Sequence, residues 1–114
     1  MPFSFTLFEP KKHRQPKPTN PLVEVRPNGR IMFNNLATSL LGNNHYCSLG
    51  YDPENKAIGI LPLSESAANS FPVRYTTRGA YIGAKKALRH FGILPEARLQ
   101  NQPIQHEGFI AVKF

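Results

Sequence analysis

The sequence lacks most features from which a secreted, membrane-bound or disulfide-stabilised protein is recognised. Cys47 is the only cysteine among 114 residues, so these residues cannot form a disulfide with one another. No apolar run approaches the roughly 20 residues of a membrane-spanning helix. Residues 1–5 lack the basic and apolar regions of a signal peptide. We therefore expect a reducing, cytoplasmic location and no membrane partner.

Residue patterns typical of catalysis or metal binding are also missing. The sequence has no phosphate-binding loop, dinucleotide-binding glycine motif, nucleophile elbow or convincing carboxylate pair. Its four histidines show no metal-ligand spacing: His13, His45, His90 and His106. Cys47 alternates with apolar residues on a predicted strand, which favours a small core residue over a nucleophile. We therefore expect no catalytic residue, metal or cofactor, and predict that the protein is not an enzyme.

Acidic residues are half as numerous as basic ones. Seven Asp and Glu stand against 14 Lys and Arg, which gives a net charge of +7 and a pI near 9.9. Residues 1–30 carry six bases and two acids, and residues 73–93 carry five bases and no acid. Such an excess indicates an anionic partner.

The hydrophobic pattern predicts an α+β protein that is mostly β. Residues 1–8 alternate like a strand, and the prolines of residues 10–18 favour an extended basic arm. Residues 22–64 predict a strand, a turn, a second strand, a helix over 34–41 and a hairpin whose return strand ends at Pro62. Residues 64–70 resemble a linker, after which residues 72–114 predict the same order with a helix over 84–91 and a strand holding Ala97 and Leu99.

Helical spacing also predicts the core. The residues expected to be buried are Leu36, Ala37, Leu40, Leu41, Ala84, Ala87, Leu88 and Phe91, with Ile60 and Ile110 on the sheet beneath them.

An internal repeat emerges when the chain is shifted by 50 residues. Residues 22–64 then align with 72–114 without a gap, and the identical pairs are Val23/Val73, Gly29/Gly79, Ala37/Ala87, Gly42/Gly92, Leu49/Leu99, Pro53/Pro103 and Ile60/Ile110. These identities fall on turn, cap and core positions. The alignment predicts four parts: an arm (1–21), a first repeat (22–64), a linker (65–71) and a second repeat (72–114). Two copies suggest a pseudo-dimer that buries one shared core.

The run Gly29-Arg30-Ile31-Met32-Phe33-Asn34-Asn35-Leu36-Ala37-Thr38-Ser39-Leu40-Leu41-Gly42 resembles the opening of SpoVT/AbrB-type DNA-binding domains. The resemblance covers residues 22–64 and, more weakly, 72–114. It implies a swapped-hairpin barrel, assembled here from two copies in one chain as in MraZ-like proteins, and a role in transcription regulation. The chain departs from the family at Asn34, where proline is usual, at Thr38 and Ser39, where a basic pair is usual, and at Ala80, where the second copy lacks the arginine.

Three groups of basic residues are candidates for DNA contact. The second copy supplies Arg74, Arg78, Lys85, Lys86 and Arg89, the arm supplies Lys11, Lys12, Arg14 and Lys17, and the first turn supplies Arg26 and Arg30. Lys85 and Arg89 are four residues apart on one helix face, where like charges repel and phosphate contact would relieve the repulsion. The alternatives are a solvated helix face, a solubilising tail, and a structural salt bridge with Glu24.

We therefore expect a non-enzymatic nucleic-acid-binding protein that prefers duplex DNA. A protein-docking module is the alternative, with Phe3, Phe5 and Phe8 as its first contact residues. RNA binding is a third possibility, which the scattered aromatic residues disfavour. The sequence leaves the oligomeric state open.

Overall fold

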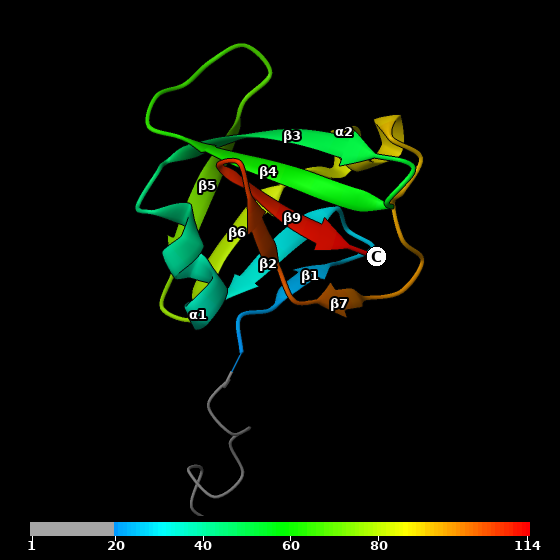
Figure 1. Ribbon diagram of the computed structural model, residues 1–114, viewed down its shortest axis with the longest axis horizontal. Helices are drawn as coiled ribbons and strands as arrows, with labels where there is room; N and C mark the ends of the chain where they lie inside the picture. Colours follow the sequence, from blue (N-terminus) through cyan, green and yellow to red (C-terminus); the bar gives the residue numbers. More distant parts are fainter. Residues whose placement is uncertain (1–19) are drawn as a thin grey trace, which may run out of the picture.

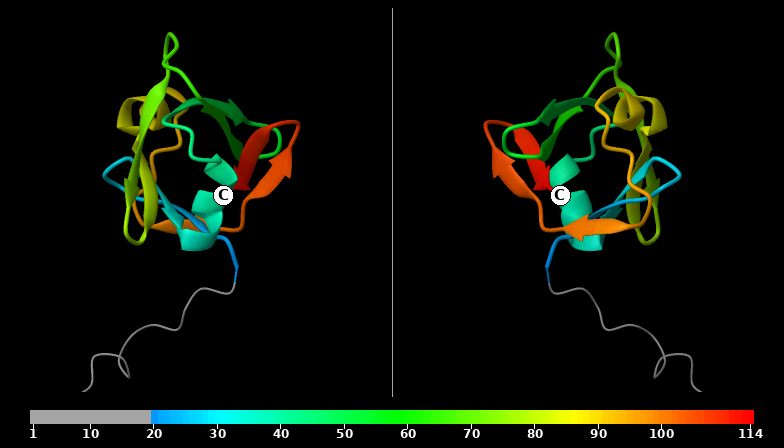
Figure 2. Two further views of the ribbon diagram at one scale, coloured as in Figure 1. Left: turned by 90° about the vertical axis from the view of Figure 1, so that its left-hand side faces the viewer. Right: turned by 90° about the vertical axis from the view of Figure 1, so that its right-hand side faces the viewer.

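A computed structural model describes residues 20–114 as a single curled sheet with two short helices. All neighbouring strands are antiparallel, in the order β7-β1-β2-β6-β5-β3-β4-β9-β8. The sheet bends into a half-barrel whose edge strands are β7 and β8 (Figures 1 and 2). The prediction of a mostly β fold is therefore confirmed, whereas the predicted strand and arm over residues 1–18 lie outside the described residues.

The strands are short, as the frequent prolines and glycines predict. They are β1 (Val23–Val25), β2 (Arg30–Asn34), β3 (Tyr46–Asp52), β4 (Ala57–Leu63), β5 (Phe71–Thr76), β6 (Gly79–Gly83), β7 (Leu99–Asn101), β8 (Ile104–His106) and β9 (Phe109–Lys113). Strand β5 thus begins at Phe71, within the predicted linker. Strand β5 is the middle strand of the nine, and the adjacent β6 pairs with β2, where Ile31 lies opposite Ile82.

Alternate residues of these strands point into the half-barrel and form its core. Val23, Val25, Ile31, Ile60, Ile82, Ile110 and Val112 are all at most 1% exposed. Because successive strand residues face opposite sides, the intervening residues form the outer face of the sheet. That outer face carries most of the charged strand residues.

Two short helices follow β2 and β6. Helix α1 (Asn35–Thr38) is capped by the Asn34 side chain, which accepts a hydrogen bond of 2.8 Å from the amide of Ala37. It continues as the 3₁₀ turn η2 (Ser39–Leu41), which ends at Gly42. Helix α2 (Lys85–His90) buries Leu88 and is followed by Gly92 at φ +73°. The helices lie at opposite corners of the half-barrel in Figure 1.

Several predicted core positions are wrong. Leu36 is 41% exposed, while Leu40, Ala87 and Phe91 are only half-buried. The burial pattern predicted for residues 34–41 assumed one continuous α-helix. Helix α1 instead spans only four residues and buries Ala37 alone, which leaves Leu36 exposed. The chain then changes to the tighter 3₁₀ geometry at Ser39, which alters the direction of Leu40. Ala37, Leu41, Ala84 and Leu88 are fully buried, as predicted.

Two predicted strand limits are also wrong. Pro62 lies inside β4, opposite Cys47, and does not end the strand. Strand β9 pairs with β4 only as far as Ile60, so β4 has an open side at Pro62 that tolerates a residue without an amide hydrogen. Ala97 precedes β7, and Leu99 on that strand is 40% exposed.

Candidate nucleic-acid interface

The outer face of strands β2, β6 and β5 carries two arginines around a tyrosine. Met32 lies opposite Tyr81, and Tyr81 lies opposite Arg74, so the three side chains share the outer face. Arg30 belongs to the same face because it is two residues from Met32. Its guanidinium carbon lies 4.6 Å from the centre of the Tyr81 ring, a cation–π contact that orients the charge.

The turn between β1 and β2 packs directly on the beginning of α2. The Gly29 carbonyl accepts a hydrogen bond of 2.8 Å from the amide of Ala84, the residue before the helix. A Cβ atom on Gly29 would lie 2.4 Å from the Cβ of Lys85. Because Gly29 also has φ +85°, only glycine fits this contact without strain. The contact places Arg30 beside the first turn of α2.

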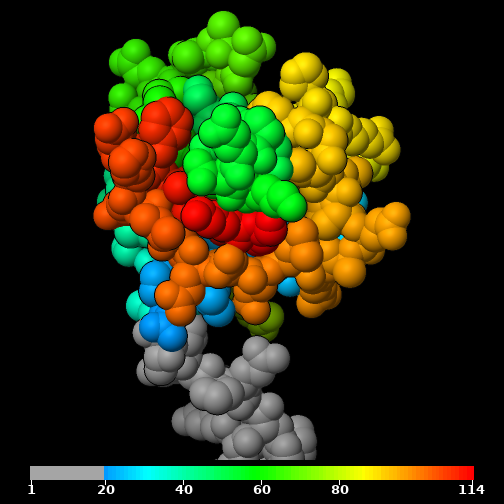
Figure 3. All heavy atoms as spheres, turned by 45° about the vertical axis from the view of Figure 1, so that its right-hand side comes forward, coloured from blue at the N-terminus to red at the C-terminus, as the bar shows by residue number. Residues whose placement is uncertain are grey.

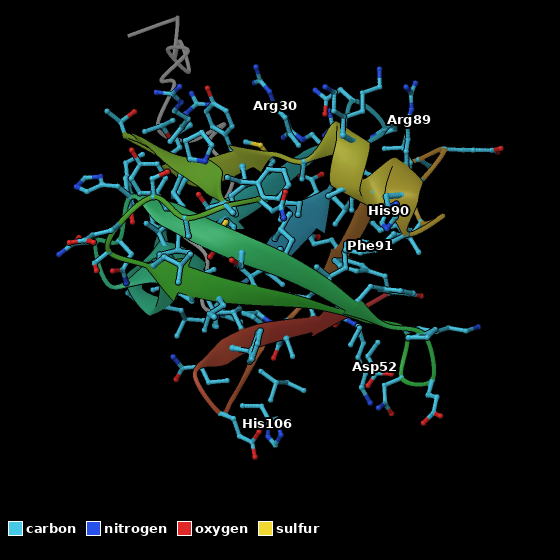
Figure 4. All side chains as sticks on the ribbon, turned by 90° about the horizontal axis from the view of Figure 1, so that it is seen from above. Arg30, Asp52, Arg89, His90, Phe91 and His106 are labelled. Carbon is cyan, nitrogen blue, oxygen red and sulfur yellow. The ribbon has the colours of Figure 1, made fainter. Side chains whose placement is uncertain are left out.

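Helix α2 presents its basic residues to solvent. Lys85, Lys86 and Arg89 are exposed, whereas Leu88 is buried. On the inner side, Phe91 stacks on Tyr51 of β3 with ring centres 5.9 Å apart. Figure 4 shows Arg30 and Arg89 pointing away from the same side of the molecule, while Asp52 and His106 lie on the opposite side. Arg30 and Arg89 therefore share a side of the molecule that the Asp52 carboxylate does not share.

Glu24, the acidic residue on the neighbouring strand β1, is neutralised by two arginines. Its carboxylate oxygens lie 3.2 Å from Arg26 Nε and 3.7 Å from Arg98 Nε. The structural alternative for Arg26, a salt bridge with Glu24, is thus what the structure contains. Sequence reasoning missed Arg98 and Tyr81, because neither residue belongs to a local cluster and only the folded sheet brings them to their partners.

The structure therefore brings together five of the predicted site residues. We call them the basic face: Arg30, Arg74, Lys85, Lys86 and Arg89. Arg78 does not belong to the basic face. It lies in the turn before Gly79, at the end of β6 that pairs with Asn34, whereas Arg30 pairs with Gly83 at the opposite end of this strand. The remaining predicted contacts, Lys11, Lys12, Arg14 and Lys17, and the aromatic residues Phe3, Phe5 and Phe8 lie outside residues 20–114.

Outside the basic face, the described residues contain no cluster of potential metal-ligating side chains. Cys47 is fully buried, and burial raises the pKa of its thiol from 9.0 to about 12. Within residues 20–114, no three His, Cys, Asp or Glu side chains group as a metal site would require. No helix in this part of the chain has the length and apolar character needed to cross a membrane.

Comparison with known proteins gives no relative: no protein-family model matches the sequence, and neither curated proteins nor solved structures match it significantly. The resemblance to SpoVT/AbrB-type domains therefore rests on the residues of this chain alone.

Proposed function

We propose that this protein is a non-enzymatic nucleic-acid-binding protein that holds duplex DNA against the basic face. The observation that carries the proposal is the packing of Gly29 on Ala84, which joins Arg30 to the basic residues of α2. Residues 73–93 contain no acid, and Glu24 is occupied by Arg26 and Arg98. Basic side chains grouped without a free carboxylate suit a row of phosphates.

The aromatic residues favour a duplex over a single strand. Single-stranded nucleic acids are usually held by exposed rings on which bases stack. The Tyr81 ring on this face is covered by the Arg30 guanidinium, and Tyr51 and Phe91 stack on each other. The basic face can thus contact phosphates through its charged side chains but presents no free aromatic ring on which a base could stack.

We also propose that the half-barrel is built from two swapped strand–helix–hairpin copies, residues 22–64 and 72–114. A shift of 50 residues maps the β2–β6 pair Ile31↔Ile82 onto Met32↔Tyr81, and it maps the β4–β9 pair Ile60↔Ile110 onto itself. A twofold axis between the copies would produce both coincidences, whereas the β1–β7 pair Val25↔Leu99 and the β5–β3 pair Pro72↔Tyr46 keep different registers.

The contacts at the two helix starts support the same relation. The shift maps the contact of Gly29 with Ala84 onto that of Gly79 with Asn34, and a Cβ on Gly79 would lie 1.9 Å from the Phe33 carbonyl oxygen. In both cases the glycine of one copy approaches the start of the other copy's helix. Strand β8 has no counterpart in the first copy, where residues 54–56 form a turn.

The experiment that tests the DNA proposal is a fluorescence-anisotropy titration of a labelled 20-base-pair duplex at about 50 mM salt, where even non-specific binders associate. Micromolar binding is expected for the unaltered protein. The double variant Lys85→Ala/Arg89→Ala should bind about tenfold more weakly with any duplex sequence, since phosphate contacts position without specifying. Lys113→Ala, which removes an exposed lysine from β9, is the matched control and should bind normally. No binding at micromolar protein would refute the proposal.

A protein-docking function is the second candidate, supported by exposed apolar side chains on the outer face of β8 and β9. Ile104 is 57% and Phe109 39% exposed. Ile104 lies opposite Ala111, which in turn lies opposite Gly59, so these three neighbouring positions carry no polar side chain. If the titration shows no DNA binding, the first residues to mutate are Ile104 and Phe109 on this surface, together with Phe3, Phe5 and Phe8.

A further inference from the structure

A cavity of about 170 Å³ lies at one end of the half-barrel. It is lined by Val25, Tyr51, Lys56, Ile58, Ile93, Leu99 and Phe114. These residues come from β1, the β3–β4 hairpin, the segment after α2, β7 and the last residue of the chain. Figure 3 faces this end, where the green β3–β4 turn, the red C-terminal residues and the orange segment around β7 meet.

The walls of the cavity are held by contacts outside it. Tyr51 is fixed by its stack on Phe91, at 5.9 Å between ring centres. The amide of Phe114 donates a hydrogen bond of 3.1 Å to the carbonyl of Lys56, which ties the end of the chain to the β3–β4 turn. The space is therefore a property of the fold and does not depend on a single loose side chain.

Lys56 is the only residue of the lining with a charged side chain. Within residues 20–114, no carboxylate lies within 4.0 Å of its amine: the three ion pairs there involve only Glu24 and Glu107. The nearby Asp52 carboxylate instead accepts hydrogen bonds from the Asn55 side chain and from the amides of Glu54 and Asn55. The lining thus combines apolar side chains with one exposed lysine that makes no ion pair within residues 20–114.

We propose that this cavity binds a small aromatic carboxylate, with the ring among the apolar side chains and the carboxylate on Lys56. The volume suits a single ring, since an apolar cavity of about 150 Å³ in another protein binds benzene. A carboxylate supplies the charge-assisted hydrogen bond that the lysine lacks. Leu99 lines the space and is 40% exposed, so solvent and ligand can reach it.

The experiment uses the full chain, labelled with ¹⁵N, and phenylacetate as the probe. A ligand of this size should bind in about the millimolar range, with the largest amide shift changes at Ile58, Ile93 and Leu99. The neutral 2-phenylethanol has the same ring and should bind about fivefold more weakly, because it cannot pair with the ammonium. No saturable shift change, changes centred on the basic face, or equal binding of the alcohol would overturn the proposal.

Two variants locate the site without relying on DNA. Lys56→Met keeps the length of the side chain and should reduce phenylacetate affinity to that of the alcohol, whereas Lys113→Met should leave it unchanged. Leu99→Trp fills the opening and should abolish binding of both probes, with circular dichroism used to verify the fold. Equal loss in the two lysine variants would mean that the amine is not the contact. DNA binding by the unaltered protein is measured separately, so either proposal can fail while the other stands.

Discussion

The Gly29 carbonyl and the Ala84 amide, 55 residues apart in the chain, share a hydrogen bond of 2.8 Å. This bond sets the turn between β1 and β2 on the start of α2, and it brings Arg30 beside the helix that carries Lys85 and Arg89. Both the fold and the basic face therefore depend on the absence of a side chain at residue 29.

We predict that Gly29→Ala destabilises the protein by more than about 2 kcal/mol, because it combines a left-handed backbone with a steric clash. Gly92→Ala is the matched control: Gly92 also has positive φ, at +73°, but nothing lies within 4 Å of its added Cβ. The control should lose only about 1 kcal/mol. Urea unfolding measures both changes, and equal losses would show that the clash with Lys85 does not matter.

The two helical leucines should respond differently to truncation. Leu88→Ala empties a fully buried position and should cost about 2–5 kcal/mol. Leu36→Ala, at a position 41% exposed, should cost less than about 1 kcal/mol. Thermal or urea unfolding of the two variants measures these losses. A large loss of stability in Leu36→Ala would mean that Leu36 is buried, as the sequence predicted.

Leu36 shows where sequence reasoning about the fold reaches its limit. The spacing of Phe33, Leu36, Ala37, Leu40 and Leu41 correctly predicts a helical segment, and the strands on either side are correctly placed. The sequence does not show that α1 buries Ala37 alone or that the chain changes to 3₁₀ geometry at Ser39, because apolar residues three or four apart fit both kinds of helix. The sequence does not indicate the strand order either, since pairs such as β1–β7 join segments far apart in the chain.

Acid should weaken the β3–β4 turn through Asp52. The hydrogen bond from the Asn55 side chain, followed by that from the Asn55 backbone, lowers the pKa of this carboxyl below its ordinary value of 3.8. A lowered pKa stabilises the folded state at pH above 3.8, and that stabilisation is lost as the pH falls through the folded-state pKa. The stability difference between the unaltered protein and Asp52→Asn should therefore shrink on acidification.

Urea unfolding at pH 7 and near pH 2.5 measures this difference. Glu54→Gln is the control, since the Glu54 side chain makes none of the hydrogen bonds of the turn. If the gap between Asp52→Asn and the unaltered protein stayed constant with pH, the turn would not hold the ionised carboxylate.

Alkali should act through Cys47. Burial raises the pKa of this thiol from 9.0 to about 12, so the neutral thiol stabilises the fold fully below pH 9. That contribution is lost as the pH rises from 9 toward 12, because only the unfolded chain ionises readily in this range. Cys47→Ala, which has no thiol to ionise, should show a smaller loss of stability between pH 8.5 and 10.5 than the unaltered protein. Equal losses would place the thiol in contact with water.

The candidate site was predictable in part. The acid-free run over residues 73–93 identifies Lys85, Lys86 and Arg89 from composition alone. The sequence also names Arg30 as a candidate contact. Its position beside α2, its cation–π contact with Tyr81 and the pairing of Glu24 with Arg98 require the folded sheet, because each joins residues from different strands or turns. The separation of Arg78 from the other arginines likewise follows from the direction of β6.

The most direct test of the basic face is the salt dependence of duplex binding. If its five cations all contact phosphates, the logarithm of the association constant should fall with the logarithm of salt concentration with a slope of about −4 to −5. The variants Arg30→Ala, Lys85→Ala and Arg89→Ala should each flatten that slope by about one, with Lys113→Ala as the unaffected control. A slope that these three substitutions leave unchanged would contradict the claim that residues from β2 and α2 form one DNA-binding face.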